Sequence, residues 1–319
     1  MNFKAPNFLN ITPANKISEW CEIIHCTLDS GKDVYYIGDI ETTGLRPDGD
    51  KNNKDLKDRA LEIAFLCYIQ NDNGVFEELK DISGNHIFFH EYINPFAEEL
   101  SEKNRYRSID YIPNEARSVH GISKEFLDGL KGLEDSNGEE TNFKLKQKAP
   151  TFAQIKPILD LYFYTSNVSI NAGRRIFTAH NGGDFDAKFL SSEWHKAELY
   201  HENHLQPARF ESFVDILDTL SLIKDMYKSS RELSIAYSNN VNFDESVKVN
   251  YKLDFLKIFY NHENIERDVH GAMIDSYLLA KVFFSMLSDN SYLNMPLVKK
   301  HSNIQKNFEI LDTKEIRLL

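Results

Sequence analysis

The sequence has few of the features that mark secreted, membrane-spanning or disulfide-rich proteins. It holds three cysteines, Cys21, Cys26 and Cys67, which are too few and wrongly spaced for a disulfide framework or a zinc site. No apolar run approaches the roughly 18 residues that span a bilayer. Residues 1–16 also lack the apolar region of a signal peptide. We therefore expect no membrane partner and a cytoplasmic location.

Positive charge is also scarce. The 319 residues carry 37 Lys and Arg against 49 Asp and Glu, which gives a net charge of −12 and a pI near 5.4. This balance argues against a protein that coats nucleic acid through its overall field, but it leaves room for an enzyme that holds one nucleic-acid end. A content of 41% apolar residues is enough to build a core, so wholesale disorder is excluded.

The hydrophobic pattern predicts an α/β fold. Runs of β-forming residues predict strands at 34–41, 60–69, 86–93, 175–180 and 213–217. Helical spacing predicts helices at 15–30, 151–163 with a candidate kink at Pro157, 184–199, 252–260 and 269–287. Three strands followed by alternating strands and helices are typical of an antiparallel meander that continues into an α/β unit with a mixed sheet.

Two carboxylates, Asp39 and Glu41, end the strand predicted at 34–41. Side chains two residues apart on a strand project from one face, so these two point together. The spacing alone is weak, because acid-x-acid pairs arise by chance about seven times in a chain this acidic. Their place is more informative, since Thr42, Thr43 and Gly44 mark the end of the strand, where α/β proteins put their sites.

Two predicted helices each carry one acid on their apolar face. Asp186 and Asp275 are followed at helical spacing by apolar residues, namely Phe189, Leu190 and Trp194 in one helix and Leu278, Leu279 and Val282 in the other. A buried carboxylate is costly unless it is paired, protonated or bound to a metal, and a capping or salt-bridged Asp is the ordinary alternative in each case. Taken with Asp39 and Glu41, the four inward acids need cations.

A histidine precedes one of these acids. His270 lies five residues before Asp275, a spacing that on a regular helix separates two side chains by about 140°. Gly271 is a weak helix former, so we expect His270 on the loop or first turn, from which it can reach the site. One such His–acid spacing is weak evidence when it stands alone.

In this order the motifs resemble those of the DnaQ-like, DEDDh-type 3′–5′ exonucleases. The motifs are DIETTG at 39–44, AHNGGDFDAKFL at 179–190 and HGAMID at 270–275, supported by LEIA at 61–64, VHGIS at 119–123 and DTL at 218–220. The likeness covers roughly residues 33–287. VHGIS and ETTGL are most similar to the proofreading subunit of bacterial DNA polymerase III, whereas the four residues between Asn181 and Asp186 are similar to the three-prime repair exonucleases of animals.

This longer spacing leaves two acids, Asp184 and Asp186, in one turn as candidates for the second motif. Phe185 before Asp186, and the apolar pair at 189–190 after it, fit the register of the family and favour Asp186. We expect Asp184 to be the helix N-cap.

The resemblance implies a ribonuclease H-like fold, a five-stranded mixed sheet flanked by helices. It implies that two Mg²⁺ or Mn²⁺ ions, hard cations that suit oxygen ligands, are held by Asp39, Glu41, Asp186 and Asp275. His270 is expected to take the proton from the attacking water. By the same resemblance the pocket for the terminal nucleotide is lined by Thr42, Thr43, Leu45, His120, Asn181 and Phe185.

The expected activity is release of nucleoside 5′-monophosphates from 3′ ends of single-stranded DNA, in proofreading or repair. An RNA exonuclease of the ribonuclease T or oligoribonuclease type is the alternative, since those enzymes share the five residues. An inactive binding module attached to a polymerase is less favoured, because a scaffold has no physical need for four clustered acids. A DNA polymerase or a sliding clamp is a candidate partner.

We expect a helical extension at 1–32, an exonuclease domain at 33–287 with a polar surface insertion near 129–147, and a tail at 288–319. The tail holds a candidate docking peptide for a clamp or polymerase, although a packed terminal element is favoured; its residues are Gln305, Asn307, Phe308, Ile310 and Leu311. Small basic groups are interpreted either as phosphate contacts or as solvated surface; they are Arg105 and Arg107, Lys144, Lys146 and Lys148, and Arg174 and Arg175.

Overall fold

A mixed β-sheet forms the centre of the computed structural model, which describes residues 11–48, 57–97, 111–163, 172–199, 210–241, 243–265 and 270–295. Strand β1 (Val34–Thr42) lies in the middle of the sheet. It pairs antiparallel with β2 (Ala60–Gln70) on one side and parallel with β7 (Arg175–Ala179) on the other. Strand β8 (Asp215–Asp218) adds to β7 in parallel and completes this side of the sheet.

Two shorter strands share the free edge of β2. β4 (Phe88–Tyr92) pairs with the part of β2 between Glu62 and Leu66, and β3 (Phe76–Glu78) pairs with the part between Tyr68 and Gln70. Six strands therefore fill five positions across the sheet. This order, with three antiparallel positions followed by two parallel ones, confirms the predicted ribonuclease H-like fold with a mixed sheet; the described sheet has six strands where five were predicted, because β3 and β4 share one edge.

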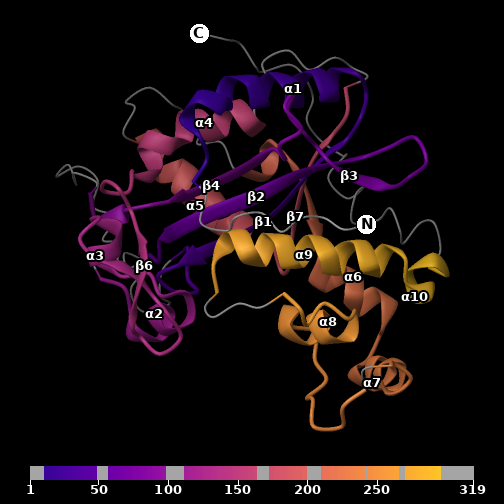
Figure 1. Cartoon of the computed structure of the whole chain (residues 1–319). Helices are drawn as coiled ribbons and strands as arrows, with labels where there is room; N and C mark the ends of the chain where they lie inside the picture. The colour runs from indigo at the N-terminus through magenta and orange to yellow at the C-terminus, as the bar shows by residue number, and fades with distance from the viewer. Residues whose placement is uncertain are drawn as a thin grey trace.

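Helices cover both faces of the sheet (Figure 1). One face packs against α1 (Ile17–Asp29), α4 (Phe152–Phe163) and α5 (Asp186–Leu199). The other packs against α6 (Thr219–Met226), α8 (Leu253–Phe259) and α9 (Ala272–Leu287). The alternation along β1 explains the two cores, because Tyr36 and Ile40 belong to the first and Tyr35 and Ile37 to the second.

A third, smaller core lies beside β2 and β4 and involves segments whose structure the sequence did not predict. Helices α2 (Asn114–His120) and α3 (Lys124–Leu127) are followed by a hairpin of β5 (Gly132–Glu134) and β6 (Glu140–Lys144). Phe126 and Leu127 are buried in this core, and Leu133 and Phe143 of the hairpin pack against it. The insertion expected near 129–147 is therefore a hairpin with a packed apolar side. The remaining helices are α7 (Ser230–Ser238) and α10 (Asn290–Leu293).

The ends of the chain add to the same cores where they are described. Trp20, Ile24 and Leu28 of α1 are buried in the first core, so the helix predicted near the N-terminus packs on the sheet. Met295 belongs to the second core. The tail residues after 295, with the candidate docking peptide, lie outside the described residues, as do Arg105 and Arg107. α4 continues on both sides of Pro157.

A buried ion cluster joins α5 to the start of β2. The Arg59 guanidinium donates to Glu193 through Nε at 2.8 Å and Nη2 at 2.9 Å, and the Lys196 ammonium lies 3.3 Å from the same carboxylate. Burial alone would raise the pKa of Glu193, but the two cations outweigh it and lower that pKa to about 2. The backbone of Arg59 in turn pairs with Thr43, so the cluster fixes the turn that follows β1.

None of the helices in the described ranges combines the length and the apolar character that crossing a membrane requires.

Candidate active site

The end of β1 brings two carboxylates to the face of the sheet that α9 covers. Tyr35 and Ile37 occupy earlier positions of this face and belong to the second core. Asp39 and Glu41 continue the same alternation, with Glu41 8% exposed and Asp39 half-buried. The period of two along the strand therefore places these two acids side by side, as predicted.

The start of α9 brings a histidine and a third acid to the same place. The helix begins at Ala272, so His270 lies on the preceding loop, as its spacing predicted. His270 Nδ1 is 2.9 Å from Asp275 Oδ2. The ligand atoms of Glu41, His270 and Asp275 all lie within 4.8 Å of one another. Figure 1 shows this first turn of α9 on the side of the molecule that carries α2 and β6.

The fourth acid comes from the opposite layer of helices. Asp186 is the first residue of α5, is 1% exposed, and its Oδ1 has no hydrogen-bond partner among the described residues. Burial raises the pKa of Asp186 to about 8; its own backbone amide opposes the shift, Asp218 adds to it, and the Ile40 amide opposes it. The contribution of Ile40 places this carboxyl beside β1.

Four acidic neighbours affect the pKa of Asp39. Its pKa is raised well above the ordinary range, first by burial and then by Asp186, Glu41, Asp275 and Glu62 in that order. Three elements, β1, α5 and α9, thus bring the four predicted acids into one electrostatic cluster, and His270 lies at its edge.

The two candidate acids of the second motif, Asp184 and Asp186, differ clearly in their surroundings. The Asp184 side chain is 79% exposed and forms an ion pair with Lys188 at 2.8 Å. α5 begins at Asp186, so Phe185 occupies the N-cap position and the expectation that Asp184 caps the helix is wrong. Its carboxylate reaches the i+4 lysine instead. Asp186 is the acid that joins the cluster.

Three of the residues predicted to line the nucleotide pocket lie at the end of β1 and in the turn that follows it; Thr42 and Thr43 are buried and Leu45 is exposed. Leu45 is 78% exposed next to the site. The Thr42 hydroxyl donates to the Gly44 carbonyl at 2.6 Å. Thr43 is fully buried, and its hydroxyl donates to Asp58 and accepts from the Arg59 amide. Thr43 therefore holds the turn from inside, while Leu45 projects into solvent.

The remaining pocket residues come from α2 and the turn before α5. His120 is 2% exposed and its Nδ1 accepts from the Ile122 amide at 3.0 Å. Burial lowers the pKa of His120 to about 4, the Thr42 backbone opposes the shift, and His270 adds to it, which places His120 beside both. Asn181 adopts a left-handed φ of 72°, and its amide donates to Asp218. The Phe185 ring packs on Phe189 with centroids 4.9 Å apart.

A fifth carboxylate was missed as a site residue. Glu62 on β2 lies directly opposite Glu41 in the strand register and is 2% exposed. His90 Nε2 lies 2.7 Å from its Oε1. The signal was present in LEIA at 61–64, where one acid interrupts an otherwise apolar buried strand. Like charges directly opposite on a sheet repel each other, so the pairing of Glu62 with Glu41 is unfavourable. Glu62 also raises the pKa of Asp39.

The donor set fits divalent cations. Carboxylate oxygens are the ligands that Mg²⁺ and Mn²⁺ prefer, and Asp39, Glu41, Asp186 and Asp275 offer them in one place. Bound cations would satisfy the lone Oδ1 of Asp186 and offset the mutual repulsion that raises the pKa of Asp39. The residues present therefore suit the metal that the resemblance implies.

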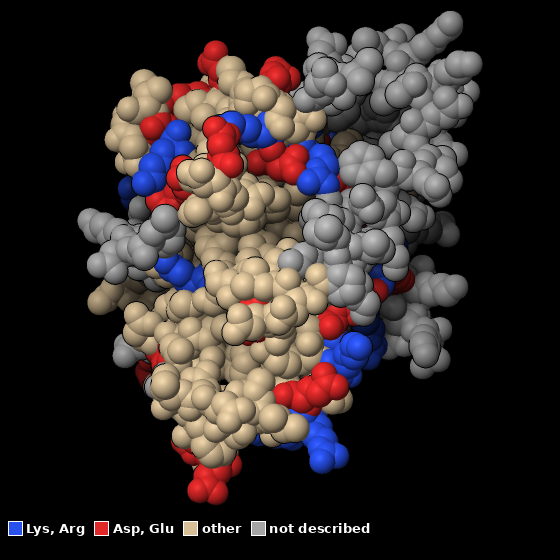
Figure 2. Space-filling view, turned by 90° about the vertical axis from the view of Figure 1, so that its right-hand side faces the viewer, with Lys and Arg blue, Asp and Glu red and all other residues tan. Residues whose placement is uncertain are grey.

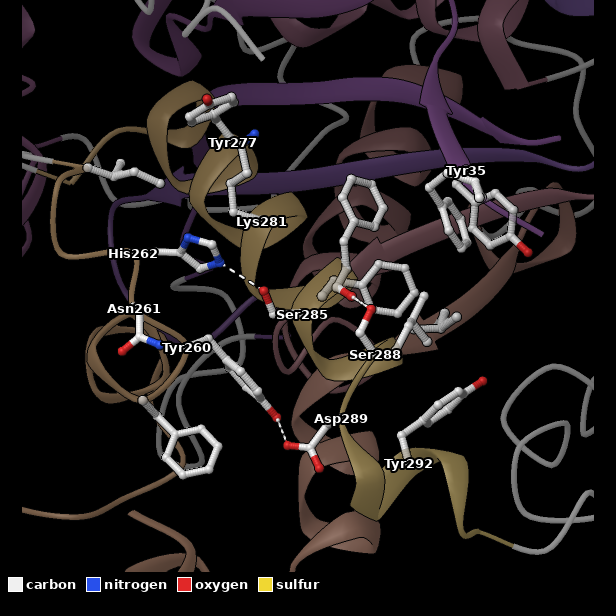
Figure 3. A pocket seen from close by; sticks show the side chains of 18 of the residues that line it. Tyr35, Tyr260, Asn261, His262, Tyr277, Lys281, Ser285, Ser288, Asp289 and Tyr292 are labelled. Carbon is white, nitrogen blue, oxygen red and sulfur yellow. Dashed lines mark hydrogen bonds between the residues drawn. The ribbon is translucent and has the colours of Figure 1, made fainter. Parts of the chain in front are cut away.

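A separate cavity of about 1330 Å³ lies at the opposite end of β1. Tyr35, Asp289 and Tyr292 are among its lining residues, and the Tyr260 hydroxyl donates to Asp289 there (Figure 3). Figure 2 shows this end of the molecule, where charged residues lie mainly around the margins of the described surface. None of the predicted site residues is among the described residues that line this cavity.

Known proteins resemble the chain over most of its length. It is 26% identical to DNA polymerase III subunit epsilon of Rickettsia typhi over 289 residues, which cover 87% of this chain and 89% of that protein. It is also 26% identical to the epsilon subunit of Buchnera aphidicola subsp. Baizongia pistaciae, over 85% of this chain and 78% of that protein. No family model matches. The relatives confirm the predicted resemblance to DnaQ-like proteins of the bacterial DNA polymerase III type.

Two solved structures are more distant. The nuclease domain of 3′hExo, a DEDDh family member bound to rAMP, has 15% identity and a TM-score of 0.47, with 82% of this chain and 94% of that chain covered. Escherichia coli exonuclease I in complex with a dA16 oligonucleotide has 13% identity and a TM-score of 0.46 over 82% of this chain. The match spans only 42% of the exonuclease I chain. Both TM-scores are below 0.5, so the fold assignment depends on the strand order itself.

The raised pKa of Asp186 predicts how the metal-free protein responds to pH. Between the ordinary Asp pKa near 4 and about 8, the folded chain holds a proton that the unfolded chain has released, so stability falls as pH rises through this window. Asp186→Asn removes this penalty. We expect the variant to be more stable than the wild type at pH 7 in EDTA, by at least about 1 kcal/mol in urea unfolding.

Asp184→Asn is the matched control, because its carboxylate is exposed two residues earlier in the same turn. We expect its free energy of unfolding to stay within about 0.5 kcal/mol of the wild type. A metal-free Asp186→Asn protein that is less stable than the wild type would contradict the assignment of Asp186 as a buried, unsatisfied carboxyl.

Proposed function

We propose that the chain is a divalent-metal-dependent exonuclease that removes nucleoside 5′-monophosphates from the 3′ ends of single-stranded DNA. One observation carries the proposal: Asp39, Glu41, Asp186 and Asp275 converge from three elements with His270 at their edge. Four clustered acids are unfavourable without cations, and a histidine beside them is suited to proton transfer. The residue roles proposed here are those that the family resemblance implies.

The four acids would hold two Mg²⁺ or Mn²⁺ ions. When bound, such ions polarise a phosphoryl oxygen and stabilise charge on the attacking and leaving oxygens of an in-line displacement. Asp186 suits this role through its partnerless buried oxygen, and Glu41 and Asp275 through ligand atoms that lie within 4.8 Å of each other. Asp39 is close enough to Asp186, Glu41 and Asp275 for each of them to raise its pKa.

We assign His270 the role of general base. Its Nδ1 faces the Asp275 carboxylate at 2.9 Å, and because a carboxylate only accepts, the proton of the neutral imidazole lies on Nδ1. Nε2 then carries the lone pair that can take a proton from the attacking water. The side chain is 41% exposed, so water and a nucleotide can reach it. Attack at phosphorus breaks the bond to the 3′ oxygen of the preceding nucleotide, and that oxygen takes a proton from solvent water to leave as a 3′ hydroxyl.

The terminal nucleotide would bind beside the turn after β1. Leu45 offers an exposed apolar side chain for base contact, and neutral His120 is buried next to Thr42 and His270. We include Asn181 and Phe185 in this pocket, since both lie on the turn of residues 180–185 that leads into α5. Thr43 supports the pocket from within the fold.

A role in proofreading or repair is the biological context that we propose. Its support is the similarity to epsilon subunits of DNA polymerase III over most of the chain. A DNA polymerase is accordingly the proposed partner, and a sliding clamp is a second candidate. The net charge of −12 fits an enzyme that holds a short 3′ end or is delivered to DNA by a partner. The cytoplasmic location stays a prediction.

A nuclease assay on labelled single-stranded DNA tests the proposal. We expect mononucleotide release with Mg²⁺ or Mn²⁺, complete loss in EDTA, and recovery when metal is restored. His270→Gln should lower the rate by about 100-fold or more, since general base catalysis contributes this much. Asp39→Ala should reduce it to background, and both variants should keep the wild-type circular dichroism spectrum. Asp184→Asn should keep full activity; full activity in either site variant would refute the mechanism.

The sugar preference separates the proposal from the RNA exonuclease alternative. Matched DNA and RNA duplexes with identical 3′ overhangs should be shortened faster when the overhang is DNA. Faster trimming of RNA would assign the chain to the ribonuclease T or oligoribonuclease type. Absence of any metal-dependent trimming in a folded protein would favour the inactive binding module.

A further inference from the structure

The hairpin near 129–147 contacts the helix that carries His120. Arg117 on α2 donates through Nε to Glu134 Oε2 at 2.6 Å and through Nη2 to Glu134 Oε1, a bidentate pair. The Glu134 amide donates to the Gly121 carbonyl at 3.1 Å. One residue of the hairpin therefore holds both the side of α2 and the turn that ends it.

Gly121 permits this close approach. It ends α2 in the left-handed region, with φ of 70°, and a Cβ placed there would lie 2.0 Å from the Glu134 carbonyl oxygen. The end of α2 and strand β5 are therefore in direct backbone contact. Leu133 and Phe143 of the hairpin also pack against the third core with Phe126, so the hairpin is anchored on its apolar side.

The same end of α2 contacts the candidate active site. The Val119 carbonyl accepts from the His270 backbone amide at 2.9 Å, and this bond fixes the loop that carries the imidazole. His120, the next residue, lies beside His270 and Thr42. A continuous set of contacts thus runs from Glu134, through α2 and its last turn, to the backbone of His270.

We propose that Arg117 and Glu134 are positioning residues for His270. The inference rests on the proposed function, in which His270 is the general base. The ion pair holds α2 in the position in which the Val119 carbonyl accepts from the His270 amide. This backbone hydrogen bond keeps the His270 imidazole against Asp275. An insertion that the sequence marked only as polar surface thereby supports proton transfer. Small displacements of a catalytic group lower the rate steeply, which makes such support effective.

The ion pair can be removed without unfolding the chain. Glu134→Ala is the milder variant, because it leaves only Arg117, whose side chain is 37% exposed, without this partner. Arg117→Ala leaves the Glu134 carboxylate, whose side chain is 11% exposed, without it. The backbone pairing of Glu134 with Gly121 and the apolar side of the hairpin remain in place.

The experiment compares Glu134→Ala, Arg117→Ala and the charge-swapped double variant R117E/E134R on single-stranded DNA with saturating Mg²⁺. We expect each single variant to lower kcat by about 10-fold and leave KM within about twofold, because the pair positions the base and does not touch DNA. The double variant should recover most of kcat, since the pair forms again with reversed charges. Lys156→Ala, which breaks an ion pair with Asp160 on α4, is the control and should match the wild type.

A second measurement follows His270 without turnover. The imidazole C–H resonance of His270, assigned by its loss in His270→Gln, should shift or broaden in metal-free Glu134→Ala and return in the double variant. An unchanged kcat and an unchanged resonance in Glu134→Ala would overturn the inference while leaving the proposed function intact. A folded wild-type protein without nuclease activity would refute the proposed function, and the resonance would still decide whether the hairpin positions His270.

Discussion

Electrostatic repulsion among carboxylates at the end of β1 is the constraint on which the rest of the structure depends. Asp39, Glu41, Asp186 and Asp275 are brought together where burial already opposes ionisation. Burial and the neighbouring acids raise the pKa of Asp39, whereas burial, with a smaller contribution from Asp218, raises the pKa of Asp186. Folding must overcome this cost through the cores on each side of the sheet. The cluster makes physical sense as a site for divalent cations, which is the central claim of the account.

The surrounding strands, helices and hairpin hold the site residues in place. β1 is central in the sheet and is held by β2 and β7, and α9 packs across its acidic face. The buried cluster of Arg59, Glu193 and Lys196 fixes the turn after β1 through the backbone of Arg59, which pairs with Thr43. The hairpin and α2 hold the loop of His270 from the side. Each contact acts on backbone next to a functional side chain, so the site is built by rigid elements.

Much of the site could be predicted because its geometry is local. The period of two on a strand paired Asp39 with Glu41, and the helical period placed Asp275 on the inner face of α9. Gly271 predicted that His270 lies outside the helix, and α9 does begin after it, at Ala272. The same rules predicted the main strands and helices, since these have strong apolar periodicity.

What escaped prediction depends on contacts between distant segments. The LEIA pattern marks Glu62 as an acid in a buried strand, but its place opposite Glu41 follows from the pairing of two strands and not from its own segment. The hairpin is polar on one side and apolar on the other, and its contact with Gly121 follows from tertiary packing. Asp184 was expected to cap α5, but the helix begins two residues later and Lys188 takes its carboxylate.

Metal stoichiometry shows whether the clustered acids bind divalent cations. Calorimetric titration of Mn²⁺ into the whole chain, with thymidine 5′-monophosphate present, should show two saturable sites per chain. Asp39→Asn should weaken or abolish this binding, whereas Asp184→Asn should leave it unchanged, because only Asp39 faces the cluster. No saturable binding by the wild-type chain, or equal binding by Asp39→Asn, would contradict the account.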